Sequence, residues 1–174
     1  MDTDAPRRSF LSWITGGLMA AVGAALAVPA GWLLSHPIRR KTVHGGEAPI
    51  PVARLDALPE GVPVRATVVA PARFDAWSRQ DRVPLGAVWL VRKGSEVTAL
   101  STTCPHAGCF VDWEPKNTRF QCPCHESAFS LDGARVAGPS PRAMDSLTVE
   151  VKDGKVLVQY RRFRQAVSDK ETLG

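Results

Sequence analysis

Two short segments rich in cysteine and histidine constrain this chain more than any other feature. They read CPHAGC at residues 104–109 and CPCHES at residues 122–127, and they hold all four cysteines of the 174-residue chain. Their two histidines bring the number of soft ligands to six, whereas a structural zinc site uses four. Cysteines clustered in this way argue against a fold held by dispersed disulfides. We therefore expect one local metal site built from two loops.

The spacing within the two segments indicates how the ligands pair. Cys104-x-His106 and Cys122-x-x-His125 each form a close pair, and 15 residues lie between the pairs. This interval fits a loop, a strand and a second loop, so that two hairpin loops present the pairs face to face.

Two cysteines, Cys109 and Cys124, are left over. Each lies in the same loop as a ligand pair, and we regard both as candidates for a disulfide that joins the loops. A tetrahedral zinc site with two Cys and two His ligands is the alternative, although it leaves two thiols idle beside the metal. A disulfide is typical of exported proteins and unusual in cytosolic ones.

A run without formal charge, residues 10–35, indicates a membrane anchor. As a helix with a rise of ~1.5 Å per residue its 26 residues span about 39 Å, enough for a hydrocarbon core of ~30 Å. Trp13 and Trp32 fall near the two ends, where indole rings favour the headgroup layer. The run is longer than the apolar part of a signal peptide, but the triplet Ala25-Leu26-Ala27 keeps cleavage as the alternative. We expect a retained transmembrane helix.

The residues before this run, 1–9, predict its orientation. Arg7-Arg8 ahead of an apolar run resembles a twin-arginine signal, which directs the export of folded proteins. Charge alone does not orient the helix, because the basic residues 39–41 follow it on the other side. The twin-arginine pattern predicts a single-pass protein of the bacterial cytoplasmic membrane, with its N-terminus inside and its soluble domain on the outer, periplasmic side.

Beyond the anchor the sequence predicts a linker and then an all-β domain. Residues 36–60 contain four prolines and Gly45-Gly46, which is the composition of a flexible linker. Over 61–174 we expect an antiparallel β sandwich with the metal loops at one end and with Trp77, Trp89 and Trp113 in its core. Alternating apolar residues predict strands over 63–70, 87–92, 96–102, 146–151 and 155–160. Asp153-Gly154 between the last two predicts a tight hairpin.

The two loops resemble the cluster-binding boxes of the Rieske iron–sulfur subunits of quinol–cytochrome c oxidoreductases, the cytochrome bc-type complexes. The family pattern is Cys-Thr-His-Leu-Gly-Cys and Cys-Pro-Cys-His-Gly-Ser. The sequence GPSPR at 138–142 is similar to the family's proline loop, and the anchor and linker extend the resemblance over nearly the whole chain. It implies one [2Fe–2S] cluster in a Rieske fold with a cluster-binding subdomain.

Roles follow from the resemblance by position. It implies Cys104 and Cys122 on one iron, His106 and His125 on the other, and a disulfide between Cys109 and Cys124. Two neutral imidazoles in place of two thiolates make the cluster less negative, so an electron is added more easily. The resemblance further implies that His125 hydrogen-bonds the quinol hydroxyl, with His106 as its exposed companion.

Four positions in or near the boxes bear on the redox potential and the shielding of the cluster. Ser127 stands where the family's hydroxyl bonds a bridging sulfide. Phe129 stands where high-potential members have Tyr, and the loss of a hydrogen bond worth about 1 kcal/mol lowers the potential by some tens of millivolts. We therefore expect a low-potential quinol such as menaquinol. Ala107 replaces a shielding Leu, and Glu126 replaces a Gly at the tip.

These observations predict an electron-transfer subunit. We expect it to take an electron, and a proton through histidine, from quinol, and to pass the electron to a c-type cytochrome, in a membrane complex with a cytochrome b subunit. The alternatives are the Rieske small subunit of an exported molybdenum oxidase of the arsenite oxidase type, and a non-catalytic zinc-binding domain. Nucleic acid is not expected as a partner, because the basic residues behind the net charge of +5 form no stripe with aromatic residues.

Overall fold

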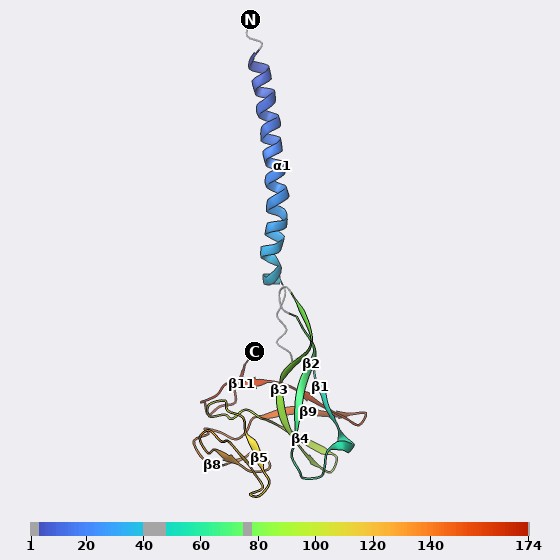
Figure 1. Cartoon of the computed structure of the whole chain (residues 1–174), viewed down its shortest axis with the longest axis vertical. Helices are drawn as coiled ribbons and strands as arrows, with labels where there is room; N and C mark the ends of the chain where they lie inside the picture. The colour runs from blue at the N-terminus through green and yellow to red at the C-terminus, as the bar shows by residue number, and fades with distance from the viewer. Residues whose placement is uncertain (1–3, 40–47, 75–77, 174) are drawn as a thin grey trace. The chain divides into compact units, whose positions relative to one another are not determined.

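The computed structural model describes residues 4–39, 48–74 and 78–173 (Figure 1). The chain divides into two compact units. One comprises Met1–Val43 with Phe74–Arg79, and the other comprises His44–Arg73 with Gln80–Gly174. The first contains a long helix, and the second contains most of the β structure. The expected fold class, an antiparallel all-β domain with one N-terminal apolar helix, is confirmed.

The helix α1 (Asp4–Arg39) extends beyond the expected anchor at both ends. Its segment Arg7–Ser35 has a mean hydropathy of 1.8 and is long enough to cross a bilayer. The hydroxyls of Ser12 and Thr15 donate to backbone carbonyls one turn earlier, at 2.9 and 2.8 Å. Such bonds satisfy polar groups within the helix itself, as a lipid environment requires. By length and composition α1 therefore qualifies as a single membrane span.

The larger sheet has six strands in the order β1-β10-β9-β4-β3-β2, and it contains all five strands expected from the sequence. Its strands are β1 (Ile50–Arg54), β2 (Val64–Phe74), β3 (Arg79–Lys93), β4 (Glu96–Ser101), β9 (Ser146–Lys152) and β10 (Lys155–Gln159). The hairpin between β9 and β10 turns at Asp153 and Gly154, which both have positive φ, at 51° and 69°. Asn-Gly and Asp-Gly pairs favour this turn because both central residues must be left-handed.

The C-terminal part of the predicted linker, residues 36–60, belongs to the folded domain. A short strand, β1, pairs antiparallel with β10, with Ile50 opposite Val158, and the 3-10 helix η1 (Leu55–Ala57) follows it. Ile50 and Leu58 are buried in the core. Strand β1 contains one proline, Pro51, and the sheet tolerates it because β1 is an edge strand, where one missing N–H donor leaves no partner unpaired. Residues 40–47 of the expected linker lie outside the described residues.

A smaller sheet carries the two Cys/His segments. Its four strands, in the order β5-β6-β7-β8, are β5 (Asp112–Glu114), β6 (Arg119–Gln121), β7 (Ala128–Phe129) and β8 (Arg135–Ala137); β5 and β8 are yellow and orange in Figure 1. Phe120 packs against Trp89 and Trp113, with ring centroids 5.6 and 5.0 Å apart. The Trp89 indole N–H donates to the Val111 carbonyl at 2.9 Å, which ties β3 to this subdomain. Trp77 lies outside the described residues.

The C-terminal segment, residues 161–173, folds back onto the domain. Strand β11 (Arg162–Phe163) pairs antiparallel with β12 (Thr172–Leu173). Phe163 is buried in the core of the larger sheet. The Lys170 ammonium lies 5.0 Å from the centre of the Phe163 ring and donates to the Ser146 carbonyl at 2.6 Å. This charged segment is therefore held against the domain.

Candidate metal centre

The two Cys/His segments adopt the same loop, residue for residue. In the first, the Cys104 N–H donates to the Cys109 carbonyl at 2.7 Å, and the Gly108 N–H donates to the Cys104 carbonyl at 3.0 Å. In the second, the Cys122 N–H donates to the carbonyl five residues on at 2.8 Å, and the N–H four residues on returns to the Cys122 carbonyl at 3.1 Å. Each loop thus closes on its first cysteine, which fixes that sulfur.

A left-handed residue completes each loop. Gly108 has φ of 81°, and Glu126, at the equivalent position, has φ of 59°. Glycine adopts this region freely, whereas an L-residue with a side chain pays a steric cost. Glu126 therefore stands, fully exposed at the loop tip, at a position that the loop geometry suits to glycine.

Cys104 and Cys122 are free thiols, buried in the core of the smaller sheet beside each other. Burial raises the pKa of the Cys104 thiol, and the neighbouring Cys122 sulfur raises it further. The backbone N–H of His106 and the Ser127 hydroxyl act in the opposite direction, by hydrogen bonding to the Cys104 sulfur. Two buried sulfurs therefore lie side by side in a hydrophobic core, with hydrogen-bond donors suited to a thiolate.

His106 and His125 come from different loops and lie together. Their ring centroids are 4.7 Å apart, with the planes nearly perpendicular at 89°. The Nδ1 atom of His106 is buried and has no hydrogen-bond partner among the described residues. Buried polar atoms rarely go unpaired, so this nitrogen is suited to a ligand that the protein itself does not supply. His125 is exposed, and His106, expected as its exposed companion, is half-buried.

A disulfide joins the loops through Cys109 and Cys124. Their sulfurs and that of Cys122 lie within 4.8 Å of one another, which superficially resembles a three-cysteine metal site. Two of these sulfurs are already bonded to each other, however, and a metal needs thiolates. The sulfurs open to a metal are those of Cys104 and Cys122.

The donor set therefore fits a Rieske centre. Two thiols are buried side by side, two imidazoles lie together, and one imidazole nitrogen is buried with no partner in the described part of the chain. Two Cys and two His are the ligands that a Rieske [2Fe–2S] cluster takes. The remaining two cysteines, idle in a zinc site, are used by the disulfide.

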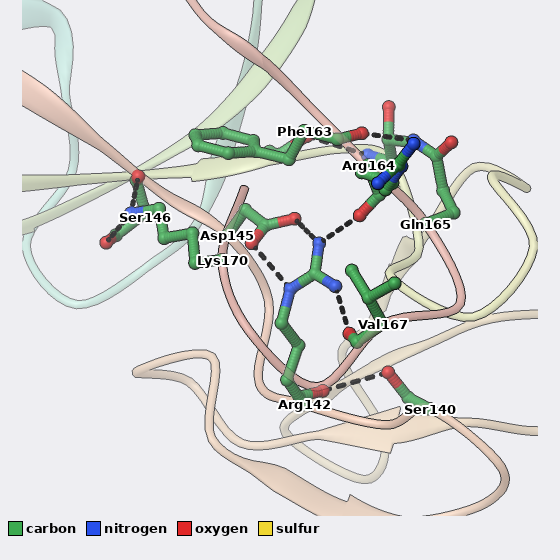
Figure 2. A network of polar contacts seen from close by, with 11 residues as sticks. Ser140, Arg142, Asp145, Ser146, Phe163, Arg164, Gln165, Val167 and Lys170 are labelled. Atoms are coloured by element: carbon green, nitrogen blue, oxygen red, sulfur yellow. Dashed lines mark hydrogen bonds and ion pairs between the residues drawn. The ribbon is translucent and has the colours of Figure 1, made fainter. Parts of the chain in front are cut away.

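The proline loop, residues 138–142, covers the second Cys/His loop. A Cβ on Gly138 would lie only 2.4 Å from the Ser127 Cα, so the two backbones are in direct contact. The Ser140 N–H donates to the Ser127 hydroxyl at 3.1 Å, and Ser127 is completely buried. The Ser140 hydroxyl in turn donates to the Arg142 carbonyl at 2.8 Å (Figure 2). Only glycine permits the close approach at the start of this loop.

The other positions expected to affect the redox potential or the shielding of the cluster differ in their burial. Phe129, in β7, is completely buried in the same core as Cys104 and Cys122. Ala107 is exposed at the tip of the first loop. It stands where the family has a larger leucine that shields the cluster. Arg142 and Asp145, whose pairing no sequence motif had marked, form a buried ion pair at the end of the proline loop. The only signal of it in the sequence is a basic residue following GPSP.

Comparisons with known proteins agree with this geometry. The family model described as the Rieske [2Fe-2S] domain matches residues 48–158. The menaquinol:cytochrome c reductase iron-sulfur subunit of Bacillus subtilis is 32% identical over 162 residues, 87% of this chain and 89% of that protein. The cytochrome b6-f complex iron-sulfur subunit 3 of Nostoc sp. is 31% identical, over 87% of this chain and 83% of that protein.

A solved structure supports the fold. The quaternary ammonium Rieske monooxygenase CntA aligns with a TM-score of 0.50 and 18% identity, over 74% of this chain and 36% of that chain. At this identity the likeness concerns the fold alone.

Proposed function

Because the chain belongs to the Rieske [2Fe-2S] domain family, we propose that it is the electron-transferring iron–sulfur subunit of a membrane quinol–cytochrome c reductase. The single observation that carries this proposal is the pair of disulfide-linked loops, whose two free thiols lie beside each other and whose two imidazoles lie together. The relatives support it, since their names describe iron–sulfur subunits of a menaquinol:cytochrome c reductase and of a cytochrome b6-f complex, over most of their lengths.

In the proposed ligand set, Cys104 and Cys122 hold one iron, and His106 and His125 hold the other. The burial of both thiols and the unpaired Nδ1 of His106 support this assignment. When bound, the cluster supplies one-electron chemistry at a potential raised by its two neutral ligands. The hydrophobic residues around Cys104 and Cys122 keep water from the sulfurs.

His125 is the group that we propose to meet the quinol. It is the exposed member of the histidine pair, on the loop that the disulfide and the proline loop both brace. A ring nitrogen that is not bound to metal can accept a hydrogen bond from a quinol hydroxyl and then hold its proton. His106 is half-buried and has less access to a substrate.

The helix α1 is the proposed anchor, since Arg7–Ser35 has the length and hydropathy of a membrane span. We propose that residues 1–9 face the cytoplasm and that the Rieske domain faces the periplasm, on the strength of Arg7-Arg8. The partners that follow from this placement are a cytochrome b subunit, a c-type cytochrome and membrane lipid.

The quinol is proposed to be menaquinol. Phe129 supports this because a buried phenyl ring cannot donate the hydrogen bond that a tyrosine hydroxyl gives to a cysteine sulfur. A cluster with fewer such bonds has a lower potential, which suits a strongly reducing quinol. The Bacillus relative is itself named for menaquinol.

The test is spectroscopy and metal analysis of the full-length protein purified from membranes. We expect iron and acid-labile sulfide in equal amounts, and a Rieske-type electron paramagnetic resonance signal after dithionite reduction. Variants His106→Ala and His125→Ala should lose that signal, whereas His44→Ala, outside the two loops, should keep it. A silent protein with stoichiometric zinc would overturn the proposal.

Co-purification identifies the complex. A cytochrome b subunit and quinol-dependent reduction of cytochrome c are expected. A molybdenum-containing subunit in their place would contradict the proposed complex and would identify the protein as the small subunit of an exported molybdenum oxidase.

A further inference from the structure

The C-terminal segment, residues 161–173, reaches the first Cys/His loop at one point. The Ala166 N–H donates a hydrogen bond to the Pro105 carbonyl at 2.8 Å. Beside it, Gln165 lies against Gly108 of the same loop, where an added Cβ would come within 3.8 Å of its side chain. Pro105 stands between the proposed ligands Cys104 and His106, so this contact touches the backbone of the cluster site.

A buried ion pair fastens the segment in that position (Figure 2). The Arg142 guanidinium forms two bonds to the Asp145 carboxylate, at 2.9 and 2.8 Å, with the two side chains only 10% and 5% exposed. Its remaining N–H groups donate to the Val167 carbonyl at 2.5 Å and to the Arg164 carbonyl at 2.7 Å. These carbonyls flank Ala166 in the chain. Arg142 therefore holds the backbone on both sides of the N–H that reaches Pro105.

Ala166 itself is in an unfavourable conformation. Its φ is 60°, in the left-handed region that a residue with a Cβ adopts at a steric cost. Such residues persist where the surrounding contacts over-determine the backbone. Here those contacts are the Arg142 bonds on either side and the bond to Pro105. The strain indicates that the direction of this N–H is imposed by the fold.

The peptide group that accepts this bond also acts on the cluster site. Its carbonyl belongs to Pro105, and its N–H belongs to His106, whose backbone hydrogen bond lowers the pKa of the Cys104 thiol. One planar group thus links the Ala166 N–H to a sulfur of the site. Hydrogen bonds in such a chain polarise one another, so a bond accepted at the carbonyl strengthens the bond donated by the N–H.

We propose that the C-terminal segment tunes the cluster through this chain: Ala166, held by Arg142, polarises the Pro105–His106 peptide and strengthens its hydrogen bond to the Cys104 sulfur. The inference rests on the proposed ligand role of Cys104. Hydrogen bonds to cluster sulfurs stabilise the more negative reduced state, so the bond raises the midpoint potential. Ala166 and Arg142 are positioning residues, since neither touches a ligand side chain.

The decisive experiment removes only the N–H. An amide-to-ester substitution at Ala166 replaces that N–H by oxygen and leaves the side chain in place. The matched control is Ala166→Gly, which keeps the N–H and relieves the left-handed strain. In full-length protein purified with its cluster, we measure the midpoint potential by redox titration and the hydrogen exchange of the His106 amide by mass spectrometry.

A second pair of variants tests whether the ion pair of Arg142 and Asp145 holds the C-terminal segment in place. Arg142→Met combined with Asp145→Leu removes the ion pair without leaving a buried charge. Its control is Arg164→Met, which breaks only the exposed bond from Arg164 to Glu171. If the double variant does not fold, the comparison between the Ala166 ester and Ala166→Gly tests the inference alone.

We expect a lower midpoint potential and faster His106 amide exchange in the ester protein, and the same direction in the double variant. Both controls should stay at the value of the unaltered protein. An ester protein with an unchanged potential overturns the inference, and so does a glycine variant that shifts equally. The iron and sulfide content of the unaltered protein is measured first, and their absence would contradict the proposed function. An unchanged midpoint potential in an ester protein that contains the cluster is a separate result, and it contradicts only the present inference.

Discussion

The backbone N–H of Ser140 donates to the hydroxyl oxygen of Ser127 across 3.1 Å, with both residues buried. This bond joins the proline loop to the second Cys/His loop. The same hydroxyl interacts with the Cys104 sulfur of the first loop. Ser127 is therefore the residue at which three segments meet, and a hydroxyl serves because it both accepts and donates.

Ser127→Ala should destabilise the domain. It leaves the buried Ser140 N–H without an acceptor, and an unsatisfied buried group costs about 1–3 kcal/mol. The free energy of unfolding from denaturant titration measures the loss. Ser130→Ala is the control, because the Ser130 hydroxyl serves a surface turn at Asp132 and should cost less. Equal losses in both variants would contradict the role given to Ser127.

Gly138→Ala should be much more damaging than Gly154→Ala. Both glycines are left-handed, with φ of 85° and 69°, but an added Cβ at Gly154 meets nothing within 4 Å. At Gly138 it lies 2.4 Å from the Ser127 Cα, so the proline loop must move away. We expect a loss of about 1 kcal/mol at Gly154 and a loss several-fold larger at Gly138, with iron released. Thermal melting and iron content measure both, and similar effects at the two sites would refute the contact.

Two substitutions at Glu126 separate charge from backbone strain. Glu126→Gln keeps the left-handed φ of 59° and removes a negative charge at the loop tip. It should raise the midpoint potential with little change in stability, because a nearby carboxylate opposes the addition of an electron. Glu126→Gly should raise the potential equally and add up to about 1 kcal/mol of stability. Potentials that do not move would show that solvent screens this charge.

Phe129→Tyr should raise the midpoint potential by some tens of millivolts, the equivalent of one hydrogen bond of about 1 kcal/mol. Phe129 is completely buried in the core that holds both free thiols, and it stands where the high-potential members of the family have the tyrosine that bonds a cysteine sulfur. Phe120→Tyr is the control, because Phe120 is equally buried but packs between two indoles. A potential that is unchanged by Phe129→Tyr refutes the hydrogen-bond argument for a low-potential cluster.

Removal of the disulfide should destabilise the paired loops. Cys109 and Cys124 are 15 residues apart in sequence, and a closed loop of that length is worth about 3 kcal/mol. Cys109→Ala with Cys124→Ala should lower the melting temperature and release iron faster under a chelator. Reduction with dithiothreitol should bring the unaltered protein to the same level and leave the double variant unchanged. If dithiothreitol destabilised the unaltered protein and the double variant equally, its effect would not come from this disulfide.

Local pattern was informative where the structure depends on neighbouring residues. Alternating apolar residues predicted the five longer strands, and Asp153-Gly154 predicted the hairpin, because strand period and turn chemistry are local properties. Strand β1 was missed because Pro49 before it and Pro51 within it resemble linker composition. Its pairing with β10 joins residues about a hundred positions apart, through Ile50 and Val158, and such pairing leaves no mark in a short window.

The sequence by itself determined the chemistry of this protein: four cysteines and two histidines in two short segments, a resemblance to the Rieske boxes, and an apolar run ahead of them. Residue type and spacing suffice for that, because ligation and membrane insertion depend on side-chain chemistry and segment length. Only the tertiary structure decided which groups support the site from outside the loops. The proline loop in contact with Ser127, the bonds from Arg142 to the Val167 and Arg164 carbonyls, and the bond from Ala166 to Pro105 all join separate segments. Those contacts arise from packing, where the position of each group is set by the whole domain rather than by its neighbours in the chain.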